Sequence, residues 1–272
     1  MAARFLLWLL IFFITATDAG AAAPEYISAA ERGAPASVAY GLAASNAAFK
    51  SENAVVAELF TSQGCSSCPP AEAFMRELSL RDDVLTFEYH VNYWDDLATP
   101  AGRWKDPYSS DDWTRRQKDY NEKLAGSSRV FTPQIVVDGQ FQDVGSHKKS
   151  ITEMVEQAKV LRRLPAWQVT PVFTREGGVT VGINGRAVER PLAVMLVRFH
   201  KRKETRVVSG ENGGETLVSF NIVTSLMPLG AFSGGKKTLK VSAPPFTDGE
   251  GCAVLLQDPE NMRIFAARFC SL

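Results

Sequence analysis

The fold is decided by the stretch Val55-Val56-Ala57-Glu58-Leu59-Phe60-Thr61-Ser62-Gln63-Gly64-Cys65-Ser66-Ser67-Cys68-Pro69-Pro70. Its first six residues are apolar apart from Glu58, as in a buried strand, and a glycine-containing turn follows. Ala71 to Leu80 has the apolar spacing of a helix. The two prolines after Cys68 are compatible with a helix start, because N–H groups of the first turn have no intrahelical acceptor. The sequence therefore predicts a strand, a turn that carries a CxxC motif, and a helix.

The two cysteines of this motif are placed for thiol–disulfide chemistry. The first turn of a helix has unpaired N–H groups and the positive end of the helix dipole, which together stabilise a thiolate. We therefore expect Cys65 to be the nucleophile. Cys68 lies one helical turn further on, close enough to attack a mixed disulfide at Cys65 and act as the resolving thiol.

Length and charge limit the classes of function. A chain of 272 residues, of which 45% are hydrophobic, is long enough for one large or two medium cores. Lys and Arg together number 30, and so do Asp and Glu. The chain therefore has no excess of positive charge that would attract nucleic acid or an anionic membrane, and we expect no nucleic-acid partner.

The N-terminus has the features of a cleavable secretory signal. Arg4 precedes an unbroken apolar run from Phe5 to Ile14, and small residues follow. The alternative, an uncleaved anchor helix, needs about 20 apolar residues, more than this run contains. We expect a signal peptide over residues 1–21, an Ala-rich leader over 22–50, and a mature protein that is exported, periplasmic or secreted, without a stable membrane anchor. Its four cysteines are then available for disulfide chemistry.

The chain after the first helix continues an α/β pattern. Val84 to Val91 has the pattern of a second strand, so the β-α-β unit implies a parallel pair. An insert over residues 92–129 follows, rich in aromatic and charged residues, with a helix expected from Trp113 to Leu124. Its aromatic residues either pack the insert onto the sheet or line a groove beside the cysteines.

A β-hairpin and a helix complete the first half. Asp138-Gly139 lies between two alternating apolar runs, which is a strong hairpin signal. Pro133 lies at the start of the first hairpin strand, where proline costs no hydrogen bond in mid-strand. Residues 147–164 have the apolar spacing of a helix. The predicted order is β-α-β, helical insert, β-hairpin, α.

This order resembles the thioredoxin fold, with Thr132-Pro133 at the position of the loop whose cis proline packs beside the CxxC motif. A cis bond there lets the preceding residue offer its N–H and C=O to an extended substrate next to the reactive sulfur. The resemblance implies a thioredoxin-like domain over residues 51–164, with a central mixed sheet flanked by helices. The residues expected to contact the substrate are Thr132, Pro133, Gln63 and Trp94.

More narrowly, the chain resembles a secreted bacterial family known as domain of unknown function 1223, from about Ala54 to the C-terminus. The stretches that carry this resemblance are Phe60–Glu72, His90–Asp95, Trp104–Pro107, Arg116-Gln117 and Phe131–Gln134. The chain departs from the family at Asn92, where Asp is expected, and in the loop over residues 97–102. The family implies a redox pair and names no substrate.

From Pro165 onward short β runs replace the helical periodicity. Short strands separated by Gly, Asn and Pro turns are typical of a mostly antiparallel, β-sandwich-like domain, here over residues 165–272. Gly210–Gly214 matches a stretch of the same family, and a hairpin loop that needs positive φ explains its glycines. The expected strands are 168–173, 179–183 (before a turn at Asn184-Gly185), 192–200, 204–209, 216–221, 238–242, 253–257 and 264–269.

Cys252 and Cys270 flank an expected hairpin turn at residues 258–261. Their equal parity puts both side chains on the same face of neighbouring strands, and an exported protein would oxidise such a pair. We therefore predict a structural disulfide, provided that the register brings the two Cα atoms within about 7 Å.

Three functions compete for Cys65 and Cys68. The favoured one is an exported thiol–disulfide oxidoreductase that needs no cofactor and acts on protein or small-molecule thiols and disulfides. The second is a copper or zinc binding or delivery protein. It would need further ligands, of which only His90 is placed to approach, so no metal ligand set is assigned. The third is a partner-binding protein in which the pair is an inert disulfide.

Two further features bear on the mechanism. Ser66-Ser67, between the cysteines, matches neither oxidising nor reducing motifs, so the direction of the reaction is not predicted. Glu58 is expected either as a buried carboxylate that handles the proton of Cys68 or as an outward-facing strand charge.

Overall fold

The computed structural model describes residues 54–96, 98–100, 102–162 and 167–271. The predicted signal peptide (1–21) and leader (22–50) lie outside these ranges, within which no helix is long and apolar enough to cross a membrane. The first half contains β1 (Val55–Thr61), α2 (Pro69–Ser79), β2 (Val84–His90), α3 (Asp111–Ala125), β3 (Gln134–Val137), β4 (Phe141–Val144) and α4 (Lys148–Arg162). The second half contains β5 (Gln168–Phe173), β6 (Gly178–Gly185), β7 (Leu192–Arg206), β8 (Thr216–Phe232), β9 (Gly235–Ser242), β10 (Glu250–Gln257) and β11 (Ile264–Phe269).

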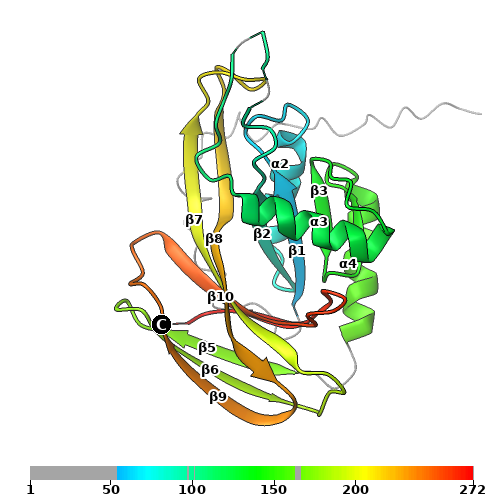
Figure 1. Ribbon diagram of the computed structural model, residues 1–272, viewed down its shortest axis with the longest axis vertical. Coiled ribbons are helices and arrows are strands. Elements are labelled where there is room, and N and C mark those ends of the chain that lie inside the picture. Colours follow the sequence, from blue (N-terminus) through cyan, green and yellow to red (C-terminus); the bar gives the residue numbers. More distant parts are fainter. Residues whose placement is uncertain (1–53, 97, 101, 163–166, 272) are drawn as a thin grey trace, which may run out of the picture.

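One mixed sheet of eight strands runs through the molecule in the order β11-β10-β7-β8-β2-β1-β3-β4 (Figure 1). β1 pairs parallel with β2 and antiparallel with β3, as the β-α-β unit and the hairpin predict. At the hairpin, Asp138 and Gly139 both have positive φ, and the Gln140 N–H donates to the Val137 carbonyl at 2.9 Å. Positive φ at both central residues is the conformation for which Asp-Gly is favoured.

Helices cover both faces of the β4–β2 end of this sheet. α2 and α4 pack on one face, against alternate residues of β1 and β3 such as Val55, Leu59 and Ile135. α3 covers the other face, where Trp113 and Tyr120 join the core formed around Phe60 and Tyr89. Because both faces are covered, every residue of β1 and β2 is buried, including the polar residues Glu88 and His90 of β2.

The other end of the sheet is also covered on both sides. One face of β7 and β10, represented by Phe199 and Leu255, belongs to the same core as α3. The opposite face, represented by Leu196 and Val254, packs against a second, antiparallel sheet of three strands in the order β5-β6-β9. This accounts for the uninterrupted apolar run in β10, of which all residues after Glu250 are buried.

The large sheet does not divide at the expected boundary between residues 164 and 165. β8 lies parallel to β2, with Glu88 opposite Ile222, so strands from both halves form one layer. The boundary therefore separates two segments of the chain but not two sheets.

The prediction of only short strands in the second half is wrong. β7 has 15 residues and β8 has 17, and the two strands form one long hairpin. They contain the segments predicted as 192–200 and 216–221 and the first half of 204–209. Register shifts between Val194 and Met195 and between Arg198 and Phe199 accommodate irregularities within the hairpin. Pairing continues through Arg202 and Lys203, where the sequence predicted a break. The predicted Asn184-Gly185 turn lies within β6, because pairing with β9 continues to Gly185.

Cys252 and Cys270 are joined by a disulfide. Ala253 pairs with Phe269 across β10 and β11, which places the two cysteines opposite each other one residue further along. The Cys270 N–H donates to the Cys252 carbonyl at 2.8 Å, and the two Cα atoms are 5.3 Å apart. The parity of the two positions is thus realised as a cross-strand bridge.

Candidate functional site

The CxxC motif occupies the turn between β1 and α2. Cys65 and Cys68 are joined by a disulfide with their Cα atoms 5.5 Å apart, and both side chains are fully buried. Cys68 is the N-cap of α2, and Pro69 and Pro70 are the first helical residues, where the missing N–H groups cost no hydrogen bond. The Cys68 N–H donates to the Cys65 carbonyl at 3.1 Å and closes the turn.

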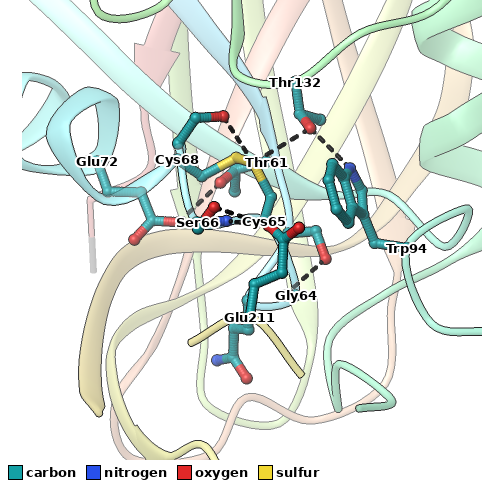
Figure 2. Close-up of a disulfide and its surroundings, with 12 residues drawn as sticks. Thr61, Gly64, Cys65, Ser66, Cys68, Glu72, Trp94, Thr132 and Glu211 are labelled. Carbon is teal, nitrogen blue, oxygen red and sulfur yellow. Dashed lines mark hydrogen bonds between the residues drawn. A yellow bond between two sulfur atoms is a disulfide. The ribbon is translucent and has the colours of Figure 1, made fainter. Parts of the chain in front are cut away.

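The loop before β3 lies directly against this disulfide (Figure 2). The Thr132-Pro133 peptide bond is cis, and the Thr132 hydroxyl donates to Cys65 Sγ over 3.4 Å. The Trp94 indole N–H donates to the same hydroxyl at 2.7 Å. Within the described part of the chain, the backbone N–H and C=O of Thr132 have no hydrogen-bond partner. Of the predicted substrate contacts, Thr132, Pro133 and Trp94 are therefore brought together at Cys65.

Gln63, also predicted to contact the substrate, is fully buried. Its backbone N–H donates to Asp106 Oδ2 at 2.8 Å, and its carbonyl accepts from Asn212 Nδ2 at 2.9 Å. Both polar atoms of its side chain are buried without a hydrogen-bond partner among the described residues. In this conformation Gln63 anchors the turn through its backbone and presents no side-chain surface to a substrate.

Two side chains from the second half of the chain complete the site. Asn212 Nδ2 donates to the carbonyls of Gln63 and Cys65, the latter at 3.0 Å. Glu211 Oε2 accepts from the Ser66 N–H at 3.0 Å and from the Ser66 hydroxyl at 2.7 Å. Figure 2 shows the Glu211 carboxylate beside Ser66 and Cys65. The backbone of the CxxC turn is thus held by a segment about 145 residues further along the chain.

These two residues belong to the loop between β7 and β8. Gly210 and Gly214 have φ values of +82° and +98°, which agrees with the prediction of a hairpin loop that needs positive φ. A Cβ atom on Gly210 would lie 2.9 Å from Trp104 Cβ, so the loop also contacts the aromatic insert closely. The loop therefore has a second role, besides joining two strands, that the sequence did not indicate.

A buried group of ionisable side chains is connected to the motif. His90 Nδ1 lies 2.7 Å from Asp106 Oδ2, and His90 Nε2 lies 3.8 Å from Glu88 Oε2. Burial lowers the pKa of His90, but the carboxylates of Asp106 and Glu88 outweigh it and raise the pKa well above its usual value. Since both ring nitrogens face carboxylates, His90 is not oriented as a ligand beside the two thiols. The described residues hold no group of three or more His, Cys, Asp or Glu side chains arranged for a metal ion.

Glu72 lies next to this group, one helical turn after Cys68 on α2. Its Oε1 accepts a hydrogen bond from the Thr61 hydroxyl at 2.7 Å. Burial, with a contribution from the nearby Glu88 carboxylate, raises the pKa of Glu72 to about 7. A carboxyl group that titrates near neutral pH therefore lies at the start of the CxxC helix. Figure 2 shows it on the side of Cys68.

Glu58 takes neither of the two roles as predicted. It is fully buried, but its Oε1 accepts from Arg116 Nη2 at 2.8 Å and its Oε2 accepts from the Tyr120 hydroxyl. Both carboxylate oxygens are thus engaged by α3, on the sheet face opposite α2. Glu72 was missed although its spacing of four residues from Cys68 was a signal in the sequence.

A family model described as "Protein of unknown function (DUF1223)" matches residues 56–257. The chain belongs to this family. The predicted family resemblance is thereby confirmed, and the matched range includes Cys65, Cys68, Thr132, Glu211 and Asn212.

Two solved structures are similar to this DUF1223 chain to different degrees. An X-ray crystal structure of a protein from Agrobacterium tumefaciens aligns with a TM-score of 0.66 and 26% sequence identity, over 80% of this chain and 93% of that chain. A domain of the outer membrane lipoprotein Omp28 from Porphyromonas gingivalis aligns over 39% of this chain and 95% of that chain. Its TM-score of 0.22 and identity of 10% are too low to carry an argument. No curated protein matches the sequence.

The raised pKa of Glu72 predicts that Glu72→Gln changes how stability depends on pH. With a folded-state pKa of about 7 against an ordinary 4.5, the folded DUF1223 protein binds more protons than the unfolded chain. The stability that protonated Glu72 contributes is complete below about pH 4.5 and is lost as the pH rises through about 7. Glutamine cannot ionise, so the variant does not lose this stability. Its free energy of unfolding should therefore rise by about 2 kcal/mol relative to that of wild type as the pH goes from about 5 to about 8. Urea unfolding of both proteins at about pH 5 and about pH 8 measures this. A difference in free energy of unfolding between variant and wild type that is the same at both pH values would contradict the prediction.

Proposed function

We propose that this DUF1223 protein is an exported thiol–disulfide oxidoreductase whose first half has a thioredoxin-like fold. The observation that carries the proposal is the contact between the Thr132 hydroxyl and Cys65 Sγ at 3.4 Å, next to a cis proline. The backbone of Thr132 is left without partners among the described residues, so it is available to pair with an extended segment beside the sulfur.

The thioredoxin-like fold is supported by the arrangement of the first half. A parallel β1–β2 pair joined through α2, an antiparallel β3–β4 hairpin, and α2 and α4 together on one face match the order expected from the resemblance. Export is supported by the predicted signal peptide and by the two disulfides, which persist in oxidising compartments.

The spacing of the two cysteines gives the reaction steps. In the reducing direction the Cys65 thiolate attacks one sulfur of a substrate disulfide, and the other sulfur leaves as a thiolate that takes up a proton. Cys68 then loses its proton and attacks Cys65 Sγ, which releases the second substrate thiol and forms the Cys65–Cys68 disulfide. Two electrons pass from the protein to the substrate, and the oxidising direction is the reverse. Glu72, with a pKa of about 7, is the nearby group suited to hold the proton of Cys68.

Access to Cys65 requires a side-chain movement. Both sulfurs are fully buried, and the Ser67 and Thr132 hydroxyls lie 3.3 and 3.4 Å from Cys65 Sγ. Ser67 itself is exposed and Trp94 is half-buried, so both lie at the surface where a substrate would approach. Phe131, 38% exposed beside Thr132, adds an apolar contact for a polypeptide substrate.

The test is to trap the mixed disulfide in the full chain. We expect Cys68→Ala to form covalent adducts with thiol or disulfide partners in an extract of the exported compartment, which mass spectrometry detects and dithiothreitol releases. The matched control is the Cys65→Ala/Cys68→Ala double variant, which keeps Cys252 and Cys270 and should form none. In wild type the reduction potential of the pair should lie above about −300 mV. A lower potential together with no adduct would identify an inert disulfide.

A further inference from the structure

The carboxylate of Glu211 occupies hydrogen-bond donors of the CxxC turn. Its Oε2 accepts from both the N–H and the hydroxyl of Ser66, the residue directly after Cys65 (Figure 2). The same loop is fixed by Asn212, whose side chain donates to the Cys65 carbonyl at 3.0 Å. A negative charge is therefore held at a defined place, one residue from the expected nucleophile and just before the N-terminus of α2.

This is the region where a Cys65 thiolate would be stabilised. Backbone donors and the helix dipole at the start of a helix favour an anion, and this lowers the pKa of a thiol there. The Ser66 N–H and hydroxyl likewise lower the pKa of Glu211, so this carboxylate is ionised at neutral pH. The Glu211 carboxylate, bound to Ser66, and a thiolate on the adjacent Cys65 would then be two anions at the same turn, and they would repel each other.

Building on the proposed function, we propose that Glu211 makes the Cys65–Cys68 pair more reducing by opposing a negative charge on Cys65. The relevant equilibrium converts the protein disulfide and two thiols of glutathione into the protein dithiol and oxidised glutathione, with two electrons and two protons transferred to the protein. Of the two states of the protein, only the dithiol can carry a Cys65 thiolate. A carboxylate that disfavours it shifts the equilibrium toward the disulfide, which lowers the reduction potential.

The other charged groups around the motif differ from Glu211 in being buried and in not contacting Ser66. Glu72 on α2, Glu88 and His90 on β2, and Asp106 in the insert are all buried and are paired with one another or with Thr61. None of them contacts Ser66 through a hydrogen bond or ion pair in the described residues. Removing the charge of Glu211 leaves this group in place, so its effect can be measured separately.

The test is Glu211→Gln in the full chain, equilibrated with glutathione buffers. The equilibrium constant for reduction should rise about threefold to tenfold, equivalent to about 14 to 30 mV at 29.6 mV per tenfold. The Cys65 pKa, followed by thiolate absorbance, should fall in parallel. Because Glu211 is exposed, the difference from wild type should shrink in about 1 M salt, where the Debye length is about 3 Å.

The matched control is Glu215→Gln, which removes an exposed carboxylate from the same loop without touching the Ser66 hydrogen bonds. The equilibrium constant for reduction of this control should stay within twofold of the wild-type value. No rise in Glu211→Gln, an equal rise in Glu215→Gln, or a rise unaffected by salt would each overturn the inference. Its failure is distinct from that of the proposed function. Adducts with Cys68→Ala but no shift refute only the role of Glu211, whereas a shift without adducts refutes only the exchange activity.

Discussion

Replacing Arg116 with methionine should lower the free energy of unfolding by about 3 to 5 kcal/mol. The Arg116 side chain on α3 is only 7% exposed, and its Nε and Nη2 donate to Glu58 Oε1 at 3.0 and 2.8 Å. Its Nη2 also donates to the Tyr120 hydroxyl at 2.8 Å, and its guanidinium lies 5.5 Å from the centre of the Tyr89 ring. Methionine fills much of the volume but leaves the Glu58 carboxylate buried without a cation, which is the main cost.

A double-mutant cycle separates the ion pair from the packing. Glu58→Gln/Arg116→Met removes both charges, so we expect the double variant to be more stable than Arg116→Met alone. The matched control is Arg115→Met on the neighbouring exposed residue, which pairs with Asp111 and Asp112 and should change stability by at most about 0.5 kcal/mol. Urea unfolding of wild type, Glu58→Gln, Arg116→Met, the double variant and the Arg115→Met control measures this. A double variant as unstable as the sum of its single variants would contradict the pairing.

The elements around the motif were predictable because their signals are local. The apolar run of β1, the prolines that begin α2, and the Asp138-Gly139 turn each depend on a few neighbouring residues. The helix expected from Trp113 to Leu124 is present as α3, and it begins two residues earlier because Ser110 is its N-cap and accepts from the Asp112 N–H. The disulfide of Cys252 and Cys270 was predicted from the equal parity of the two positions and from expected export, and the β10–β11 register supplies the close approach that the sequence left open.

What the sequence did not predict depends on contacts between distant segments. Glu58 could not be assigned because its partner Arg116 lies 58 residues away, and an isolated strand carboxylate is equally compatible with either face. The pairing of β8 with β2, and the docking of Glu211 and Asn212 on the CxxC turn, are set by where the long β7–β8 hairpin ends. No periodicity in a single strand carries that information.

Replacing Cys252 and Cys270 together with alanine should lower the free energy of unfolding by about 3 kcal/mol. The two cysteines are 18 residues apart, and their bridge reduces the conformational freedom of the unfolded chain by closing that loop. Cys252 is also buried, in the core between the two sheets, so the variant loses packing there as well.

The Cys65–Cys68 pair provides the comparison. These two cysteines are three positions apart in the sequence, so the loop that their disulfide closes is much shorter. Cys65→Ala/Cys68→Ala should therefore lower the free energy of unfolding less than Cys252→Ala/Cys270→Ala does. Urea unfolding of both double variants in non-reducing buffer measures the order. In wild type the two disulfides should also differ in how readily they are reduced. Equilibration with glutathione should reduce the CxxC pair while the β10–β11 bridge remains oxidised. If the shorter pair contributed more stability and resisted reduction, the assignment of one disulfide to chemistry and the other to structure would be wrong.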